Sequence, residues 1–108
     1  MNITIEIGKK GDRKLGPKDN PAHTKGNRTQ VRKGDVVTFT IPGADNEPRP
    51  TITFKGASPF SEEVTYGKAL KVEGAPSPTI FRYDCSARIK GENLSTDSGG
   101  EMEVLPGP

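Results

Sequence analysis

The clearest pattern in the chain is a regular alternation of apolar and polar residues in two segments. In residues 2–8, Ile3, Ile5 and Ile7 alternate with polar residues or glycine. In residues 79–89, the alternating set is Phe81, Tyr83, Cys85, Ala87 and Ile89. A period of two in β-branched and aromatic residues is typical of half-buried β-strands. We therefore expect a strand in each segment, with these side chains facing inward.

Shorter runs of the same kind predict further strands. The stretch V-R-K-G-D-V-V-T-F-T-I predicts a strand over residues 31–41, with a tight turn or kink at Gly34-Asp35. Ile52 and Phe54 predict an inward face for a short strand over residues 51–55. We also expect two short strands bent about Gly67, built on Val64, Tyr66, Leu70 and Val72, and a last strand carrying Met102 and Val104.

The remaining stretches have no apolar period. Residues 9–30 are rich in Gly, Pro, Asn and Lys, and we expect a long surface excursion there, with room for a short strand or turn near Leu15. Residues 42–50 hold three prolines and predict a connector, and residues 90–100 predict a loop. About seven short strands in 108 residues, with 13 Gly and 10 Pro and no convincing helical pattern, predict a single all-β domain. The expected architecture is an antiparallel Greek-key β-sandwich.

The charge is unevenly distributed. The whole chain carries +2, but residues 9–33 hold nine basic and two acidic side chains, a net charge of +7. This segment predicts either a surface for phosphates or an acidic partner protein, or a solvated loop. Phe, Tyr and Trp are absent from it, which argues against base stacking and so against nucleic acid. The candidate partner-binding residues are Lys9, Lys10, Arg13, Lys14, Lys18, Lys25 and Arg28.

The opening alternating strand, the V-R-K-G-D-V-V-T-F stretch and the segment Y-D-C-S-A-R together resemble the cupredoxins, the blue-copper family. The resemblance implies a β-sandwich whose copper is held by two histidines, a cysteine and a methionine. Cys85 matches the cysteine of the family. The other three ligand positions fall on Pro50 or Thr51, on Arg88 and near Ser98, and none of these residues is the expected ligand. The resemblance therefore implies the scaffold without a type 1 copper site.

Two alternatives to this interpretation stay open. Tyr83 lies two residues before Cys85, which also fits the tyrosine corner of immunoglobulin-like sandwiches, although a partner cysteine and a tryptophan are absent. An atypical copper site could instead use Cys85, His23 and Met102, with residues 9–30 folded over the end of the sandwich. Cys85 alternates in step with Phe81 and Tyr83, so its side chain is expected to point into the core. This favours a buried structural residue over a metal ligand.

Catalysis has little support in the sequence. Nucleophilic catalysis needs a well-placed base, and the one histidine, His23, lies among Pro, Asn and Lys. No apolar window is long enough for a membrane span, and no signal peptide is evident. As it stands the chain is expected to be cytoplasmic, or secreted or periplasmic if a leader peptide has been removed.

We therefore expect a non-catalytic binding module without a cofactor, whose partner is another protein and which does not act at a membrane. Its expected contact surfaces are the basic segment 9–33 and the loops at residues 42–50 and 90–100, because sandwiches carry recognition on their loops. The first alternative is a copper-binding or electron-transfer protein with an atypical site at Cys85. The second alternative is anion or nucleic-acid binding through residues 9–33.

Overall fold

Strand β1 (Asn2–Gly11) links the two layers of the fold. The computed structural model describes residues 1–20, 22–96 and 99–106. The first half of β1 pairs with β5 (Val36–Thr40), and its second half pairs with β2 (Lys14–Pro17). Ile3, Ile5 and Ile7 are at most 2% exposed. The inward face predicted from the alternation is therefore confirmed.

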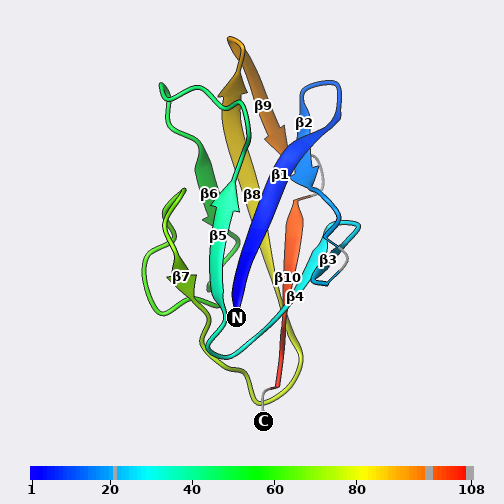
Figure 1. Ribbon diagram of the computed structural model, residues 1–108, viewed down its shortest axis with the longest axis vertical. Helices are drawn as coiled ribbons and strands as arrows, with labels where there is room; N and C mark the ends of the chain where they lie inside the picture. The colour runs from blue at the N-terminus through cyan, green and yellow to red at the C-terminus, as the bar shows by residue number, and fades with distance from the viewer. Residues whose placement is uncertain (21, 97–98, 107–108) are drawn as a thin grey trace.

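Strand β8 (Thr79–Ile89) organises the second layer (Figure 1). One of its edges pairs with β6 (Thr51–Phe54). Its other edge pairs end to end with β10 (Gly100–Leu105) and β9 (Glu92–Thr96). Next to β10 lie β4 (Arg28–Arg32) and then β3 (Thr24–Lys25), while β7 (Leu70–Lys71) pairs with the outer edge of β5.

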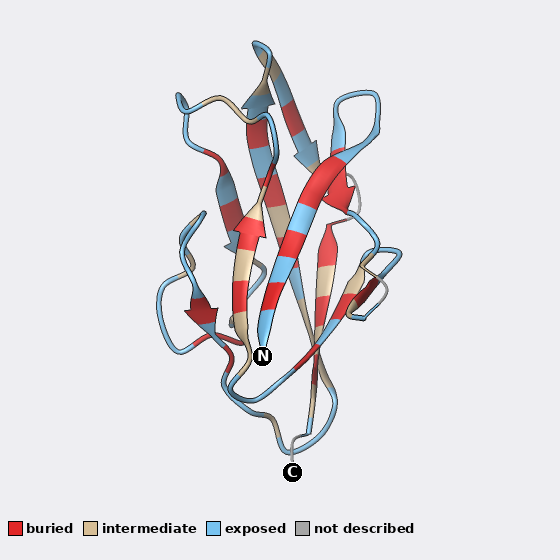
Figure 2. Cartoon of the chain, viewed as in Figure 1, coloured by how far each residue is buried: buried red, intermediate tan, exposed pale blue. Residues whose placement is uncertain are grey.

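The core lies between the two layers. Phe39 of β5 meets Tyr83 of β8 edge to face, with ring centroids 5.2 Å apart, and Phe54 and Phe60 pack around the same pair. Each such aromatic contact contributes about 0.5–1.5 kcal/mol beyond the area it buries. Figure 2 shows burial alternating along β1 and β8, as the period of two predicts. Tyr83, Cys85 and Ala87 are buried, and Phe81 and Ile89 are partly buried, so the predicted inward face of this strand is confirmed.

The all-β class is confirmed for the described residues, which form ten strands and no helix. The expectation of about seven strands, all antiparallel, is wrong in both respects. The sheet is mixed, because β1 with β5, β4 with β10 and β2 with β9 pair in parallel. Parallel neighbours need a long connection between them, and the chain between β1 and β5 is used for β2, β3 and β4.

The segment 9–30 lies largely at the surface, as expected, and the strand allowed for near Leu15 is present as β2, but the segment is not an irregular excursion, because most of it is strand. The first strand continues to Gly11, and β2, β3 and the start of β4 follow. Leu15 is 3% exposed and Thr24 and Thr29 are 4% and 0% exposed, so part of the basic segment contributes to the interior. Pairing with neighbouring strands, and not an apolar period of its own, makes this segment extended.

Three shorter expectations also need correction. Residues 31–41 are not one kinked strand: Gly34 has φ 87°, and the chain passes there from β4 beside β10 to β5 beside β1. The expected loop at residues 90–100 contains β9, so the chain forms a tight hairpin with β8. Of the two strands expected about Gly67, only β7 forms, and Val72 makes a single bridge to Phe60.

Candidate functional site

Cys85 is a core residue in the middle of β8. It pairs with Ile52 of β6 and is 2% exposed. Burial, and then the negative charge of Asp84, raise the pKa of its thiol to about 12. The thiolate is the form that binds metals and attacks electrophiles, so at neutral pH this group is a protonated thiol with the reactivity of a small apolar side chain.

The structure does not bring the three candidate copper ligands together. Met102 of β10 pairs with Phe81, which lies four positions before Cys85 on β8, a separation of about 13 Å along the strand. A shared metal would need both sulfur atoms within about 3 Å of it. His23 lies in the turn before β3, where it lines a surface hollow with Lys25 and Arg28. Among the described residues, no three His, Cys, Asp or Glu side chains are grouped so that they could hold a metal ion.

The remaining positions of the copper-site comparison are placed as follows. Thr51 begins β6, and its hydroxyl lies 2.6 Å from the hydroxyl of Ser86. Arg88 is exposed on β8, where its carbonyl accepts a hydrogen bond from the backbone of Asp45. Pro50 is buried just before β6. Ser98 lies outside the described residues.

The candidate basic residues are divided among several hollows of the surface. Arg28 is held by Glu101 of β10, with its Nη2 atom 2.9 Å from the carboxylate, and Arg82 of β8 reaches the same carboxylate at 3.2 Å. These ion pairs connect three strands at the surface, where the Arg28 and Arg82 side chains are 42% and 58% exposed, and they partly neutralise the charge of Arg28. The other basic residues line several hollows: Lys9 and Lys18 line one, Lys10 and Lys14 a second, and Lys25 lies with Arg28 in a third. Arg13 lines a fourth, which shares Lys90 and Glu92 with the hollow of Lys9 and Lys18.

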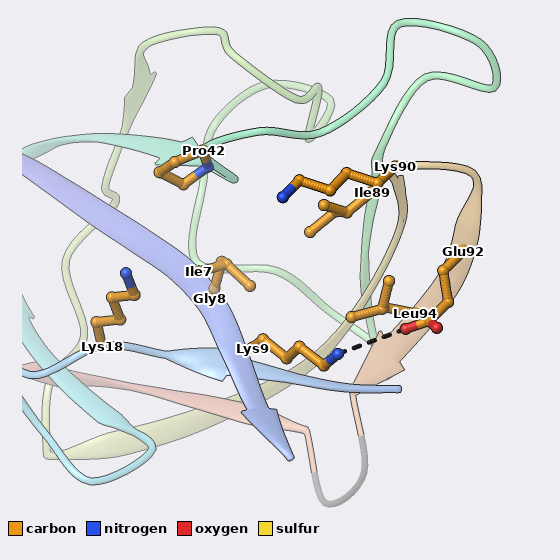
Figure 3. A pocket seen from close by; sticks show the side chains of 9 residues that line it. All are labelled: Ile7, Gly8, Lys9, Lys18, Pro42, Ile89, Lys90, Glu92 and Leu94. Carbon is orange, nitrogen blue, oxygen red and sulfur yellow. Dashed lines mark ion pairs between the residues drawn. The ribbon is translucent and has the colours of Figure 1, made fainter. Parts of the chain in front are cut away.

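The hollow that contains Lys9 and Lys18 lies where one end of the sandwich opens (Figure 3). We call it the lysine-rimmed groove. It has a volume of about 390 Å³. Its apolar part comes from Ile7, Pro42, Ile89 and Leu94. Its polar part comes from Lys9, Lys18, Lys90 and Glu92, and Gly8 completes it.

The walls of the groove are fixed by the strands around it. Ile7 and Leu94 are 0% and 4% exposed, so they are the last layer of the core at this end. Ile89 bridges to Ala44, and the carboxylate of Asp45 accepts a hydrogen bond from the backbone of Gly91 at 3.2 Å. These contacts hold the segment after β5 against the β8–β9 hairpin.

The charges of the groove are exposed and only partly paired. Lys9 lies 3.5 Å from Glu92, and Lys18 lies 3.4 Å from Glu6, with both lysine side chains more than half exposed. Lys90 has no ion pair among the described residues, and Figure 3 shows it reaching over Ile89 toward Pro42. The lining therefore carries three ammonium groups and one carboxylate, a positive balance beside an apolar surface.

The sequence anticipated part of this site. Lys9 and Lys18 belong to the predicted basic set, and Pro42 and Lys90 begin the two loops predicted as contact surfaces. Lys90 was missed as a binding residue because it lies far along the chain from the basic segment. Glu92 lies within the same predicted loop, but the sequence did not show that it pairs with Lys9.

Comparison of the chain with protein-family models, with curated proteins and with solved structures gave no match. Within the part of the chain that the structure describes, no helix is long and apolar enough to cross a membrane.

Proposed function

We propose that this chain is a non-catalytic interaction module on a cupredoxin-like, Greek-key scaffold without a type 1 copper site. In this proposal it binds a partner protein with an acidic surface through the lysine-rimmed groove. The observation that carries the proposal is the groove itself, where exposed Lys9 and Lys18 of the basic segment meet Lys90 of the β8–β9 turn beside an aliphatic surface. Complementary charge steers association with a partner and sets which partner is accepted.

The state of Cys85 supports a role without metal or covalent chemistry. A pKa raised to about 12 keeps its thiol protonated at neutral pH. Met102 and His23 are not positioned to complete a site with it. On adding Cu(II) to the purified protein we expect no intense blue absorption. Such a band would contradict this part of the proposal and favour the electron-transfer alternative.

The lining of the groove favours a protein partner over a nucleic acid. Single-stranded nucleic acids bind on aromatic side chains that stack against bases. None of the described residues that line the groove is aromatic. An acidic polypeptide can satisfy ammonium groups and cover aliphatic side chains in the same contact.

The test is a binding titration with poly-L-glutamate, and with oligothymidylate as a polyanion of another class. We compare the wild-type protein with a groove variant that carries both Lys9→Gln and Lys90→Gln. A variant that carries both Lys68→Gln and Lys71→Gln is the control, because it loses the same number of positive charges away from the groove. We expect the groove variant to lose about tenfold or more in affinity, which corresponds to about 1.4 kcal/mol, while the control stays near wild type.

Three results would contradict the proposal. The wild-type protein could fail to bind poly-L-glutamate at low ionic strength, where charge attraction is strongest. The groove variant could bind as well as the control. Oligothymidylate could bind more tightly than poly-L-glutamate, which would favour the nucleic-acid alternative.

A further inference from the structure

The lysine-rimmed groove combines two surfaces that a uniformly acidic partner would not use together. Ile89 is partly buried and Pro42 is exposed, whereas Ile7 and Leu94 are buried, so the aliphatic surface open to a ligand in the groove is mainly that of Ile89 and Pro42. The ammonium groups of Lys9 and Lys90 lie at its borders, as Figure 3 shows. A ligand that fills the site needs an aliphatic group next to anionic ones.

The site is elongated beyond the groove. A second hollow of about 410 Å³ shares Lys90 and Glu92 with it and continues over the turn of the β8–β9 hairpin to Arg13. An extended peptide fits such a track, because its successive side chains point to opposite sides. One side chain can enter the aliphatic part while its neighbours stay at the charged borders.

The ion pair between Lys9 and Glu92 is suited to exchange. Its atoms are 3.5 Å apart, and the two side chains are 54% and 42% exposed. Exposed ion pairs of this kind contribute little to stability, because water solvates both partners. A ligand carboxylate can therefore replace Glu92 at Lys9 without a large loss of stability.

We infer that the groove binds an extended peptide segment of the partner in which acidic residues flank an aliphatic one. The aliphatic side chain packs on Ile89, one carboxylate pairs with Lys90, and the other displaces Glu92 from Lys9. This inference rests on the proposed function and specifies the part of an acidic partner that is recognised.

The first test compares two blocked peptides of equal length and charge, one alternating Glu with Leu and one alternating Glu with Gly. We expect the wild-type protein to bind the leucine peptide at least tenfold more tightly. Ile89→Ser should remove this preference and leave the affinity for the glycine peptide unchanged. The two peptides carry the same charge, so the comparison isolates the aliphatic contact.

The second test concerns the exchange at Lys9. Glu92→Gln frees the ammonium group and should tighten binding of the leucine peptide several-fold, whereas Lys90→Gln should weaken it by a similar factor. Lys71→Gln on β7 removes the same charge as Lys90→Gln, serves as its control and should have no effect. If Ile89→Ser does not fold, Glu92→Gln still tests the inference, because weaker or unchanged binding contradicts displacement.

The outcomes separate this inference from the proposed function. If poly-L-glutamate binds but the leucine and glycine peptides bind equally, the acidic partner stands and the inference about its segment is wrong. If no acidic polypeptide binds, both are wrong.

Discussion

Gly100 is placed where a side chain would meet the ring of Tyr83. The two residues pair across β10 and β8, and a Cβ atom on Gly100 would overlap the ring at its hydroxyl end. Tyr83 is fully buried beside Phe39 and Phe54, so its ring has little room to move. The glycine is therefore needed for packing at this position.

We predict that Gly100→Ala lowers the free energy of unfolding by about 1–3 kcal/mol, because overpacking a well-filled core forces side chains and backbone to shift. Urea denaturation measures this change. Gly11→Ala is the matched control: the nearest atom to its Cβ would be 3.8 Å away, an ordinary contact. Equal stability of the two variants would contradict the packing described here.

Cys85 and Tyr83 predict how stability depends on pH. Burial raises the pKa of both groups, that of the thiol from an ordinary value of 9.0 to about 12. Between these two pH values the unfolded chain loses the thiol proton while the folded chain keeps it. The folded state then binds more protons, so the free energy of unfolding falls as pH rises.

The measurement is urea denaturation of the wild type and of Cys85→Ala at several values between about pH 8 and pH 11. The variant loses packing at every pH, but its stability should fall less steeply above pH 9, by up to about 1.4 kcal/mol per pH unit. Parallel pH profiles would show that the thiol titrates alike in the folded and unfolded states.

The β8–β9 hairpin is the element on which the groove depends. Its two turn residues, Lys90 and Gly91, have φ 51° and φ 78°, the pattern of a type I′ turn. Glycine adopts this conformation freely, whereas lysine is strained in it. A strained lysine at the border of the groove fits a residue that contributes to binding at some cost to stability.

We predict that Lys90→Asn changes stability and binding in opposite directions. Asparagine accepts a positive φ more readily, so the free energy of unfolding should rise by about 0.5–1 kcal/mol and the melting temperature by a few degrees. Loss of the ammonium group should weaken binding of the acidic leucine peptide. Thermal unfolding and a binding titration on the same sample check both effects, and a variant that lost both stability and affinity would oppose this account of the turn.

The sequence predicts those strands in which apolar and polar residues alternate. Ile3 to Ile7 and Phe81 to Ile89 each place several apolar side chains on one face, so both inward faces could be read directly. In contrast, β2 and β9 hold one large aliphatic residue each, Leu15 and Leu94, and become strands by pairing with neighbours. The turn of the β8–β9 hairpin is Lys90-Gly91, and a Lys-Gly pair signals a type I′ turn less clearly than Asn-Gly does.

At the scale of the whole molecule, the fold places the basic residues of the segment 9–33 at different sites, where they have different ion-pair partners. Arg28 shares the carboxylate of Glu101 with Arg82, while Lys9 pairs with Glu92 at the groove. A count of charges along the chain does not show which acidic residue each basic residue will meet. The parallel pairing of β4 with β10, for example, brings Arg28 next to Glu101, which is distant in sequence. For the same reason the sequence predicted lysines and loops but not the groove that combines them.

The central claim is that an acidic segment binds at the end of the sandwich where the groove opens. NMR of the isotopically labelled isoleucine and leucine methyl groups, recorded while the acidic leucine peptide is added, tests it most directly. The account predicts that the signals of Ile7, Ile89 and Leu94 shift together with increasing peptide, and that Ile80, near the opposite end of β8, does not move. Shifts centred on Ile80, or no methyl shifts at saturating peptide, would contradict it.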